Sequence, residues 1–233
     1  MIEVQKLHKS FDGREVLKGI DATFYDGKTN LIIGQSGSGK TVLMKNLVGL
    51  LDPTEGKVLY NGEDIFSQKY DRRQLRCEVG LVFQYPEHQL FELDVLSDVM
   101  FGPKNQGKSD DEAREIAVEA LKLLEFPEEL YEKAPFELSG GQKRRVAIAG
   151  VMAMNPKVLL LDEPTAQLDP IAASNFIGTL QKLNRELGLT ILLVEHRLEE
   201  VFPIADKVWL LDSGKLVFAD SPKKIGTYFR NNP

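Results

Sequence analysis

The hydrophobic and polar positions of the chain follow two patterns. Near the N-terminus, residues 2–7 and 16–24 alternate apolar and polar side chains, as half-buried antiparallel strands do. Later in the chain, short runs of apolar residues indicate strands that are buried on both faces. These runs are residues 78–83, 158–161 and 190–194. Because helical patterns separate them, the sequence predicts an α/β fold with a parallel core sheet and an N-terminal antiparallel β subdomain.

The central part of the chain lacks a β-rich run. Residues 109–125 begin with Ser109 and three acids, a pattern typical of a helix N-terminus, and continue with apolar residues at helical spacing. We therefore expect a helical lobe at about residues 86–150, inserted between strands of one domain that spans residues 1–233. Three further elements are predicted: a helix over 174–186, a hairpin over 207–218 whose Trp209 is a core residue, and a terminal helix over 221–229.

A glycine-rich loop lies between a predicted strand, residues 28–33, and a predicted helix, residues 42–50. It matches the phosphate-binding pattern G-x-x-x-x-G-K-[ST] at every fixed position. Its residues are Gly34, Gln35, Ser36, Gly37, Ser38, Gly39, Lys40 and Thr41. The glycines let several N–H groups point at phosphate oxygens, Lys40 reaches the β- and γ-phosphates, and the Thr41 hydroxyl binds Mg²⁺. A loop that only joins a strand to a helix does not need the Lys-Thr pair, so we predict a nucleoside triphosphate site.

Two acids follow the apolar run at 158–161. The carboxyl end of a strand beside a phosphate loop is where Mg²⁺ needs an oxygen ligand, so we predict that Asp162 binds the metal directly or through water. Glu163 is predicted to orient or deprotonate the attacking water. Without the phosphate loop, two acids that merely start a loop would be the simpler interpretation.

A second glycine-rich loop, at residues 138–142, precedes the helical stretch 143–154. Helix N-termini bind anions, yet one triphosphate does not need two such cradles from a single chain. We therefore predict a head-to-tail dimer in which this loop completes the site of the neighbouring chain. The residues expected to face the neighbour's ATP are Ser139, Gly140, Gly141 and Gln142. The basic run 143–145 is interpreted as a solvated helix face.

Composition narrows the function classes. The net charge of −6 argues against a protein that grips nucleic acid through a basic face. The single cysteine, Cys77, excludes an internal disulfide and is interpreted as an inert thiol. No apolar run approaches the length of a membrane span, so a membrane role would require a partner. Phe11 stands at the lip of a predicted turn, and spacing alone leaves open whether it is a core residue or an adenine-stacking platform.

Together these motifs resemble the ATP-binding-cassette (ABC) ATPases over essentially all 233 residues. The motifs occur in the family's order: GQSGSGKT at 34, Gln84 at the end of its strand, LSGGQ at 138, VLLLDEPT at 158, Leu168-Asp169 and His196. The resemblance implies a P-loop NTPase fold whose inserted lobe carries the LSGGQ signature. It also implies that Phe11 stacks on adenine, Asp169 crosses the dimer interface and His196 contacts the γ-phosphate. Gln84 would sense Mg²⁺ and the partner subunit, and would act with Glu163 and His196 in ATP hydrolysis.

Within that family, residues 83–105 and 194–201 resemble the ATPase subunits of energy-coupling factor (ECF) transporters, which import vitamins and metal ions. The resemblance implies that the segment from Gln84 to Phe91 forms a groove for a coupling helix of a transmembrane subunit. Exposed Leu90 and Phe91 would suit such a docking patch, whereas a loop buried under the helical lobe is the alternative. Residues 30–60 are instead similar to the ATPases of lipid-trafficking importers, which leaves two importer classes open.

We therefore predict an ATP-hydrolysing subunit of an importer, peripheral to the cytoplasmic face of the cell membrane and paired with a second copy or a paralogue. An ABC ATPase that acts on nucleic acid or ribosomes is a second hypothesis, which the acidic charge and the single cassette disfavour. A non-hydrolysing scaffold is a third, which the intact Glu163 and His196 disfavour.

Five positions stand apart from the family's motifs. Val42 stands where Ser or Thr is usual, Gln167 replaces a small residue, and Glu195 precedes His196 where Thr is common. His8 and His88 match no motif and are interpreted as surface residues.

Overall fold

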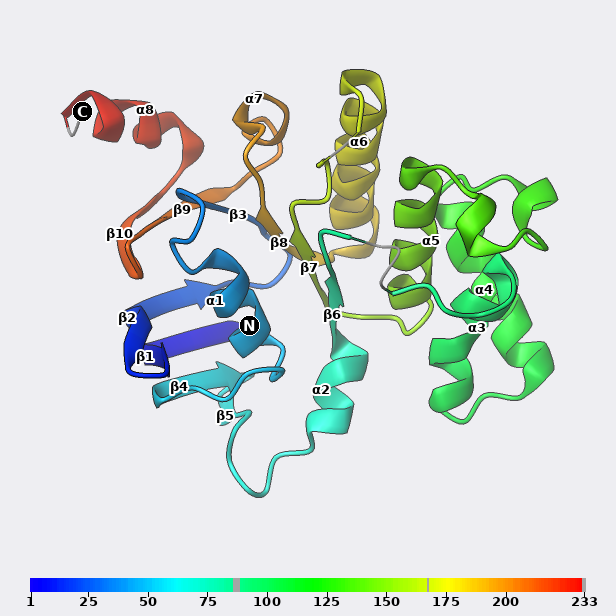
Figure 1. Cartoon of the computed structure of the whole chain (residues 1–233), viewed down its shortest axis with the longest axis horizontal. Helices are drawn as coiled ribbons and strands as arrows, with labels where there is room; N and C mark the ends of the chain where they lie inside the picture. The colour runs from blue at the N-terminus through cyan, green and yellow to red at the C-terminus, as the bar shows by residue number, and fades with distance from the viewer. Residues whose placement is uncertain (86–88, 167, 232–233) are drawn as a thin grey trace.

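The alternating residues at the N-terminus form two strands of a four-stranded antiparallel sheet, which has the order β2-β1-β4-β5 (Figure 1). The computed structural model describes residues 1–85, 89–166 and 168–231. The strands of this sheet are β1 (Ile2–Phe11), β2 (Arg14–Phe24), β4 (Glu55–Tyr60) and β5 (Glu63–Asp64). The β1–β2 hairpin turns at residues 12–13 and extends further toward the turn than the alternation predicted.

A six-stranded sheet forms the centre of the molecule, in the order β10-β9-β3-β8-β7-β6. Its strands are β3 (Thr29–Ile33), β6 (Val79–Val82), β7 (Val158–Asp162), β8 (Thr190–Val194), β9 (Lys207–Asp212) and β10 (Lys215–Asp220). All neighbouring pairs are parallel except β9–β10, which forms the predicted hairpin. Every residue of β3, β7 and β8 is buried, as expected for strands that are covered on both faces.

The central sheet has a hydrophobic core on each face. One core lies against the antiparallel sheet and includes three side chains of α1 (Lys40–Leu47): Leu43, Met44 and Leu47. Trp209 belongs to this core, as predicted; its ring centroid lies 4.9 Å from that of Phe24, and its Nε1 donates to Asn30 Oδ1 at 3.0 Å. The buried indole N–H therefore has a partner, as the burial of a polar group requires.

Helices cover the other face. Among the described residues from 89 to 152, all regular elements are helical (Figure 1). They are α3 (Val95–Asn105), α4 (Asp110–Leu123), the 3₁₀ turns η2 (Glu128–Leu130) and η3 (Pro135–Glu137), and α5 (Gly140–Met152). Ser109 caps α4 as expected: its Oγ accepts the Glu112 N–H at 3.3 Å, while the Glu112 carboxylate accepts the Ser109 N–H at 3.0 Å.

The other helices of the described residues are α2 (Arg72–Glu78), α6 (Pro170–Leu187), α7 (Leu198–Val201) and α8 (Pro222–Asn231). The α6 helix starts four residues before the predicted range, because Asp169 caps its N-terminus by accepting the N–H groups of Ile171 and Ala172. Within the described ranges, we find no helix long and apolar enough to cross a bilayer.

The arrangement of the parallel strands fixes where chemistry can occur. The carboxyl ends of β3, β6, β7 and β8 lie at the same edge of the sheet, and the glycine loop, Gln84, Asp162 with Glu163, and His196 follow these four ends. Open α/β sheets bind ligands at this edge.

Candidate functional site

The glycine loop from Gly34 to Gly39 connects β3 to the N-terminus of α1. Its backbone folds around the end of the Lys40 side chain, whose Nζ donates to Gly34 O at 2.8 Å and to Gln35 O at 2.9 Å. Burial lowers the pKa of Lys40, and the nearby carboxylates of Glu163 and Asp162 oppose that shift. The loop therefore holds a cation beside the positive end of a helix dipole, which is a site for an anion.

Gly34 is required by a close backbone approach. Its φ is 153°, and a Cβ at this position would lie 2.1 Å from Leu211 O on β9 and 2.8 Å from Ser38 Oγ. Any side chain would therefore push the loop away from the sheet.

Thr41 and Asp162 meet at the base of the loop, where Thr41 Oγ1 donates to Asp162 Oδ2 at 2.8 Å. Asp162 is 6% exposed, and burial raises its pKa, against the hydrogen bond from Thr41. One buried carboxylate and one hydroxyl fit Mg²⁺, which uses few protein oxygens and completes its shell with phosphates and water. The described residues contain no cluster of three His, Cys, Asp or Glu side chains that would hold a metal by themselves.

Gln84, Glu163 and His196 converge although they come from three different loops. Gln84 Nε2 donates to Glu163 Oε2 at 2.7 Å, and His196 Nε2 lies 2.9 Å from Glu163 Oε1. The backbone of Glu163 has φ 48°, an uncommon value for a residue with a side chain, and its N–H donates to Val194 O at 2.9 Å. Strain of this kind tends to cluster at functional sites, where the surrounding structure enforces it.

These groups border one cavity of about 870 Å³. It is lined by the glycine loop, by Lys40 and Thr41, and by Gln84, Glu163 and His196. Arg14 and Lys18 of β2 also line it, and sequence reasoning did not identify them. The signal that would have found Arg14 is the hairpin register, which pairs it directly with Phe11.

Phe11 is 41% exposed at the end of β1, and Lys9 Nζ lies 5.0 Å above its ring. Its interpretation as a core residue is therefore wrong. Phe11 is not among the residues that line the cavity, so the structure places it close by in the hairpin but outside the cavity wall.

The signature loop lies elsewhere on the same molecule. Ser139 caps α5 by accepting the Gln142 N–H at 3.3 Å, and Gln142 Oε1 accepts the Ser139 N–H at 2.8 Å. Ser139, Gly140 and Asp169 are exposed, and neither the signature residues nor Asp169 line the cavity. Gln167, the second departure from the family pattern, lies outside the described residues, as does His88.

Arg144 corrects the prediction that the run 143–145 is a solvated face. It is 3% exposed; its Nη1 donates to Ala166 O at 2.9 Å and its Nη2 to Gln84 O at 3.1 Å. The prediction is wrong because Arg144 points at two loops that end central strands, where backbone carbonyls need donors. A buried guanidinium therefore links the loop after β6 to the loop after β7.

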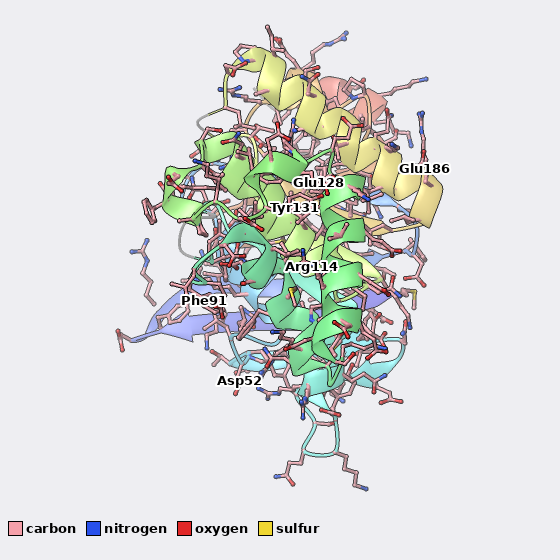
Figure 2. All side chains as sticks on the ribbon, turned by 90° about the vertical axis from the view of Figure 1, so that its right-hand side faces the viewer. Asp52, Phe91, Arg114, Glu128, Tyr131 and Glu186 are labelled. Carbon is pink, nitrogen blue, oxygen red and sulfur yellow. The ribbon has the colours of Figure 1, made fainter. Side chains whose placement is uncertain are left out.

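After Gln84 the described segment is partly exposed: Phe91 and Leu93 are exposed, whereas Leu90, predicted to be exposed, is half-buried and packs against the core beneath the helices. Phe91 is 62% exposed and Leu93 87%, so the interpretation of a loop buried under the helical lobe is wrong for these residues. Phe91 packs edge-on against Phe101 of α3, with ring centroids 4.7 Å apart, and both border a hollow of about 220 Å³. Figure 2 looks onto the helices and shows Phe91 at the surface, far from Glu186 at the end of α6.

Asp98 holds this exposed segment in place. Its Oδ2 accepts the N–H groups of Phe91 at 2.8 Å and Glu92 at 2.9 Å. Burial raises the pKa of Asp98, and these two backbone bonds oppose the shift. The apolar surface is therefore fixed by hydrogen bonds rather than by burial of its aromatic side chain.

Comparison with known sequences identifies the family to which this chain is similar. The family described as ABC transporter matches residues 17–166. An energy-coupling factor transporter ATP-binding protein EcfA2 from Ligilactobacillus salivarius is 50% identical over 211 residues, which cover 90% of this chain and 73% of that protein. A protein of the same name from Caldanaerobacter subterraneus is 45% identical over 209 residues, with 90% and 73% covered.

The similar solved structures also belong to ABC transporters. The cbiO1 protein from Clostridium perfringens, described as part of the ABC transporter complex cbiONQ, has a TM-score of 0.89 and 38% identity, and the match covers 99% of this chain and 92% of that one. A bacterial ABC transporter cassette solved as a dimer has a TM-score of 0.84 and 30% identity, covering 95% and 99%. These similarities confirm the predicted fold class.

Proposed function

The chain belongs to the ABC transporter family, and from this premise we infer that it is the ATP-hydrolysing subunit of an importer of the energy-coupling factor type. The observation that carries the inference is the convergence of Lys40, Gln84, Glu163 and His196 on one cavity beside the glycine loop. The relatives named as energy-coupling factor ATPases favour this importer class over the lipid-trafficking class.

We propose that the glycine loop binds the triphosphate of ATP. Lys40 would exchange its bonds to Gly34 O and Gln35 O for phosphate oxygens, and the loop N–H groups would take the remaining charge. The aromatic ring of Phe11 would stack on the adenine, which its exposure at the hairpin end allows. Arg14, opposite Phe11, adds a positive charge on the same side of the cavity.

Thr41 and Asp162 would hold Mg²⁺, and Gln84, which lines the same cavity as Thr41, would sense it. When bound, this ion neutralises charge on the β- and γ-phosphates. Asp162 is suited to the task because its carboxylate is buried beside the loop, where burial disfavours an uncompensated negative charge.

Glu163 would orient the attacking water and accept its proton. In the present arrangement both of its oxygens are engaged, one by Gln84 and the other by His196. Each oxygen keeps a second lone pair with which it can accept the water, and release of the His196 contact would leave that oxygen freer to orient it. His196 has a natural alternative partner in the γ-phosphate, so ATP binding would release Glu163 at the moment when it is needed.

A second chain would complete each site. Ser139, Gly140 and Asp169 are exposed and lie outside the cavity of their own chain, which supports a head-to-tail pairing in which the signature loop faces the neighbour's nucleotide. Two similar structures were solved as dimers, which supports a paired state. Binding of ATP would close the pair and hydrolysis would reopen it.

The exposed surface around Phe91 and Phe101 would receive a helix of a transmembrane subunit. Its apolar side chains border a hollow and stand on a segment pinned by Asp98, which suits a docking site. The subunit would therefore work at the cytoplasmic face of the cell membrane, where ATP is available.

ATPase kinetics and size measurements on two variants test the proposal. Lys40→Ala should abolish nucleotide binding or severely weaken it, because it removes the cation inside the loop. Glu163→Gln should bind ATP normally but lower turnover by about 10²–10⁴-fold and leave a persistent ATP-bound dimer. Full ATPase activity in Glu163→Gln, or unchanged ATP affinity in Lys40→Ala, would contradict the assigned roles.

A further inference from the structure

Glu195, the last residue before His196, is a buried carboxylate at the end of β8. Its side chain is 2% exposed, although an ionised group is costly to bury unless hydrogen bonds compensate it. The structure supplies that compensation from two separate loops, one on each carboxylate oxygen.

Oε1 of Glu195 faces the loop that follows β7. It accepts the Thr165 N–H at 2.7 Å and also the Thr165 hydroxyl. Thr165 is itself fully buried, and its carbonyl accepts the Leu168 N–H at 3.1 Å. This bond to Thr165 therefore fixes the start of the segment that leads to Asp169.

Oε2 of Glu195 faces its own loop. It accepts the His196 N–H at 2.9 Å and, more weakly, the Arg197 N–H at 3.4 Å. The backbone at His196 is thus held by the same carboxylate that holds Thr165. Only a carboxylate offers acceptor oxygens in both directions, whereas a threonine at this position would carry a single hydroxyl.

We propose that Glu195 is a positioning residue that couples the loop carrying Asp169 to the loop carrying His196. When the neighbouring chain contacts Asp169, the shift of Thr165 is passed through Glu195 to the backbone of His196, which faces the γ-phosphate. This inference rests on the proposed function, because it assumes the roles given there to Asp169 and His196.

The amide variant Glu195→Gln is the sharpest perturbation. It keeps the size of the side chain, but its amide has one acceptor oxygen and one N–H donor group. The amide NH₂ of the glutamine would therefore face either the Thr165 N–H or the His196 N–H, each of which needs an acceptor. Thr165→Val removes the hydroxyl from the same contact, and Thr165→Ser retains it.

The experiment measures kcat, KM for ATP and the melting temperature for Glu195→Gln, Thr165→Val, their double variant and Thr165→Ser. Glu186→Gln, at an exposed site near the end of α6, is the matched control. We expect kcat to fall about tenfold in Glu195→Gln and Thr165→Val with KM within twofold of the parent, because the glycine loop is untouched. The double variant should be no slower than the worse single variant, and Thr165→Ser should restore most of kcat.

The same substitutions are then placed in the Glu163→Gln background, where ATP is bound but not turned over. Coupling predicts that Glu195→Gln and Thr165→Val reduce the ATP-bound dimer fraction at a given protein concentration, while ATP affinity of the monomer stays the same. Unchanged kcat, additive losses in the double variant, or a loss that Thr165→Ser does not restore would each overturn the coupling.

Failure of the proposed function gives a different result. In that case Glu163→Gln alone would form no ATP-bound dimer, and the coupling proposal would fall with it. If Glu163→Gln does dimerise but the Glu195 and Thr165 variants behave like Glu186→Gln, only the coupling is refuted.

Discussion

The glycine at position 140 gives a test that separates folding from function. Gly140 is the first residue of α5, is exposed, and has no positive φ. Apart from its chain neighbours and the backbone of α5 itself, no heavy atom of the described residues lies within 4 Å of the position that a Cβ would take there. The structure of the single chain therefore gives no reason for a glycine at this position, and we expect the reason to be the neighbour's nucleotide.

The expected effects of Gly140→Ala have opposite signs. Alanine restricts the unfolded chain and favours the helix, so the variant should be more stable by about 0.5 kcal/mol. For a chain of this length, that raises the melting temperature by about 1–2 °C. In the dimer, the added methyl group would keep the α5 N–H groups away from the γ-phosphate. Loss of one such preorganised donor lowers kcat by about 10²–10³-fold.

The assay combines thermal unfolding with steady-state ATP hydrolysis. Gly178→Ala is the matched control, because Gly178 is an exposed residue inside α6 with nothing within 4 Å of its Cβ position. It should show the same gain in stability with unchanged hydrolysis. If Gly140→Ala also hydrolyses ATP at the parent rate, residues 139–142 do not face a nucleotide, and the head-to-tail pairing is refuted.

Two further predictions concern buried or networked charges. Arg144→Lys should lower the free energy of unfolding by about 2 kcal/mol and slow hydrolysis, because a single ammonium cannot reach both Gln84 O and Ala166 O. Urea unfolding measures the loss of stability. An unchanged urea midpoint would count against the bridge that Arg144 forms between the two loops. Glu78 accepts hydrogen bonds from Gln74, Lys157 and Tyr60, and these bonds, the one from Gln74 foremost, hold the pKa of Glu78 below its ordinary value of 4.5. A lowered folded-state pKa gives stability that is complete above the unfolded-state pKa and is lost as the pH falls through the folded-state pKa. Melting temperatures of the parent should therefore drop below about pH 4.5 more steeply than those of Glu78→Gln, and parallel curves would remove Glu78 from the acid response.

The elements that the sequence predicted well are those that residues close together in the sequence determine. The strands β7 and β8 are short apolar runs, and Ser109 with Glu112 forms the reciprocal cap that its spacing indicates. The glycine loop is equally local, since its residue types and its place between a strand and a helix define it. In each case neighbouring residues contain the whole physical reason.

The features that the sequence did not reveal depend on contacts between distant segments. Arg144 stands between two other basic residues, and only the packing of α5 against the loops after β6 and β7 distinguishes it from them. The α2 helix was also not predicted, because it is one polar segment of seven residues whose single buried side chain is Leu75. One buried residue in two turns gives no helical period to detect.

The same distant contacts explain how four strand ends become one site. The loops after the strands carry the polar groups of the site. Behind these groups, two buried residues of opposite charge, Arg144 and Glu195, link the loops to one another. Arg144 ties the loop of Gln84 to that of Ala166, and Glu195 ties the adjacent Thr165 to the loop of His196. A buried charge that lost one of these partners would carry a desolvation cost of several kcal/mol, so the loops are favoured to move together rather than separately. Glu163 contacts both Gln84 and His196 in front of this frame, so Arg144 and Glu195 hold the two residues that position its carboxylate.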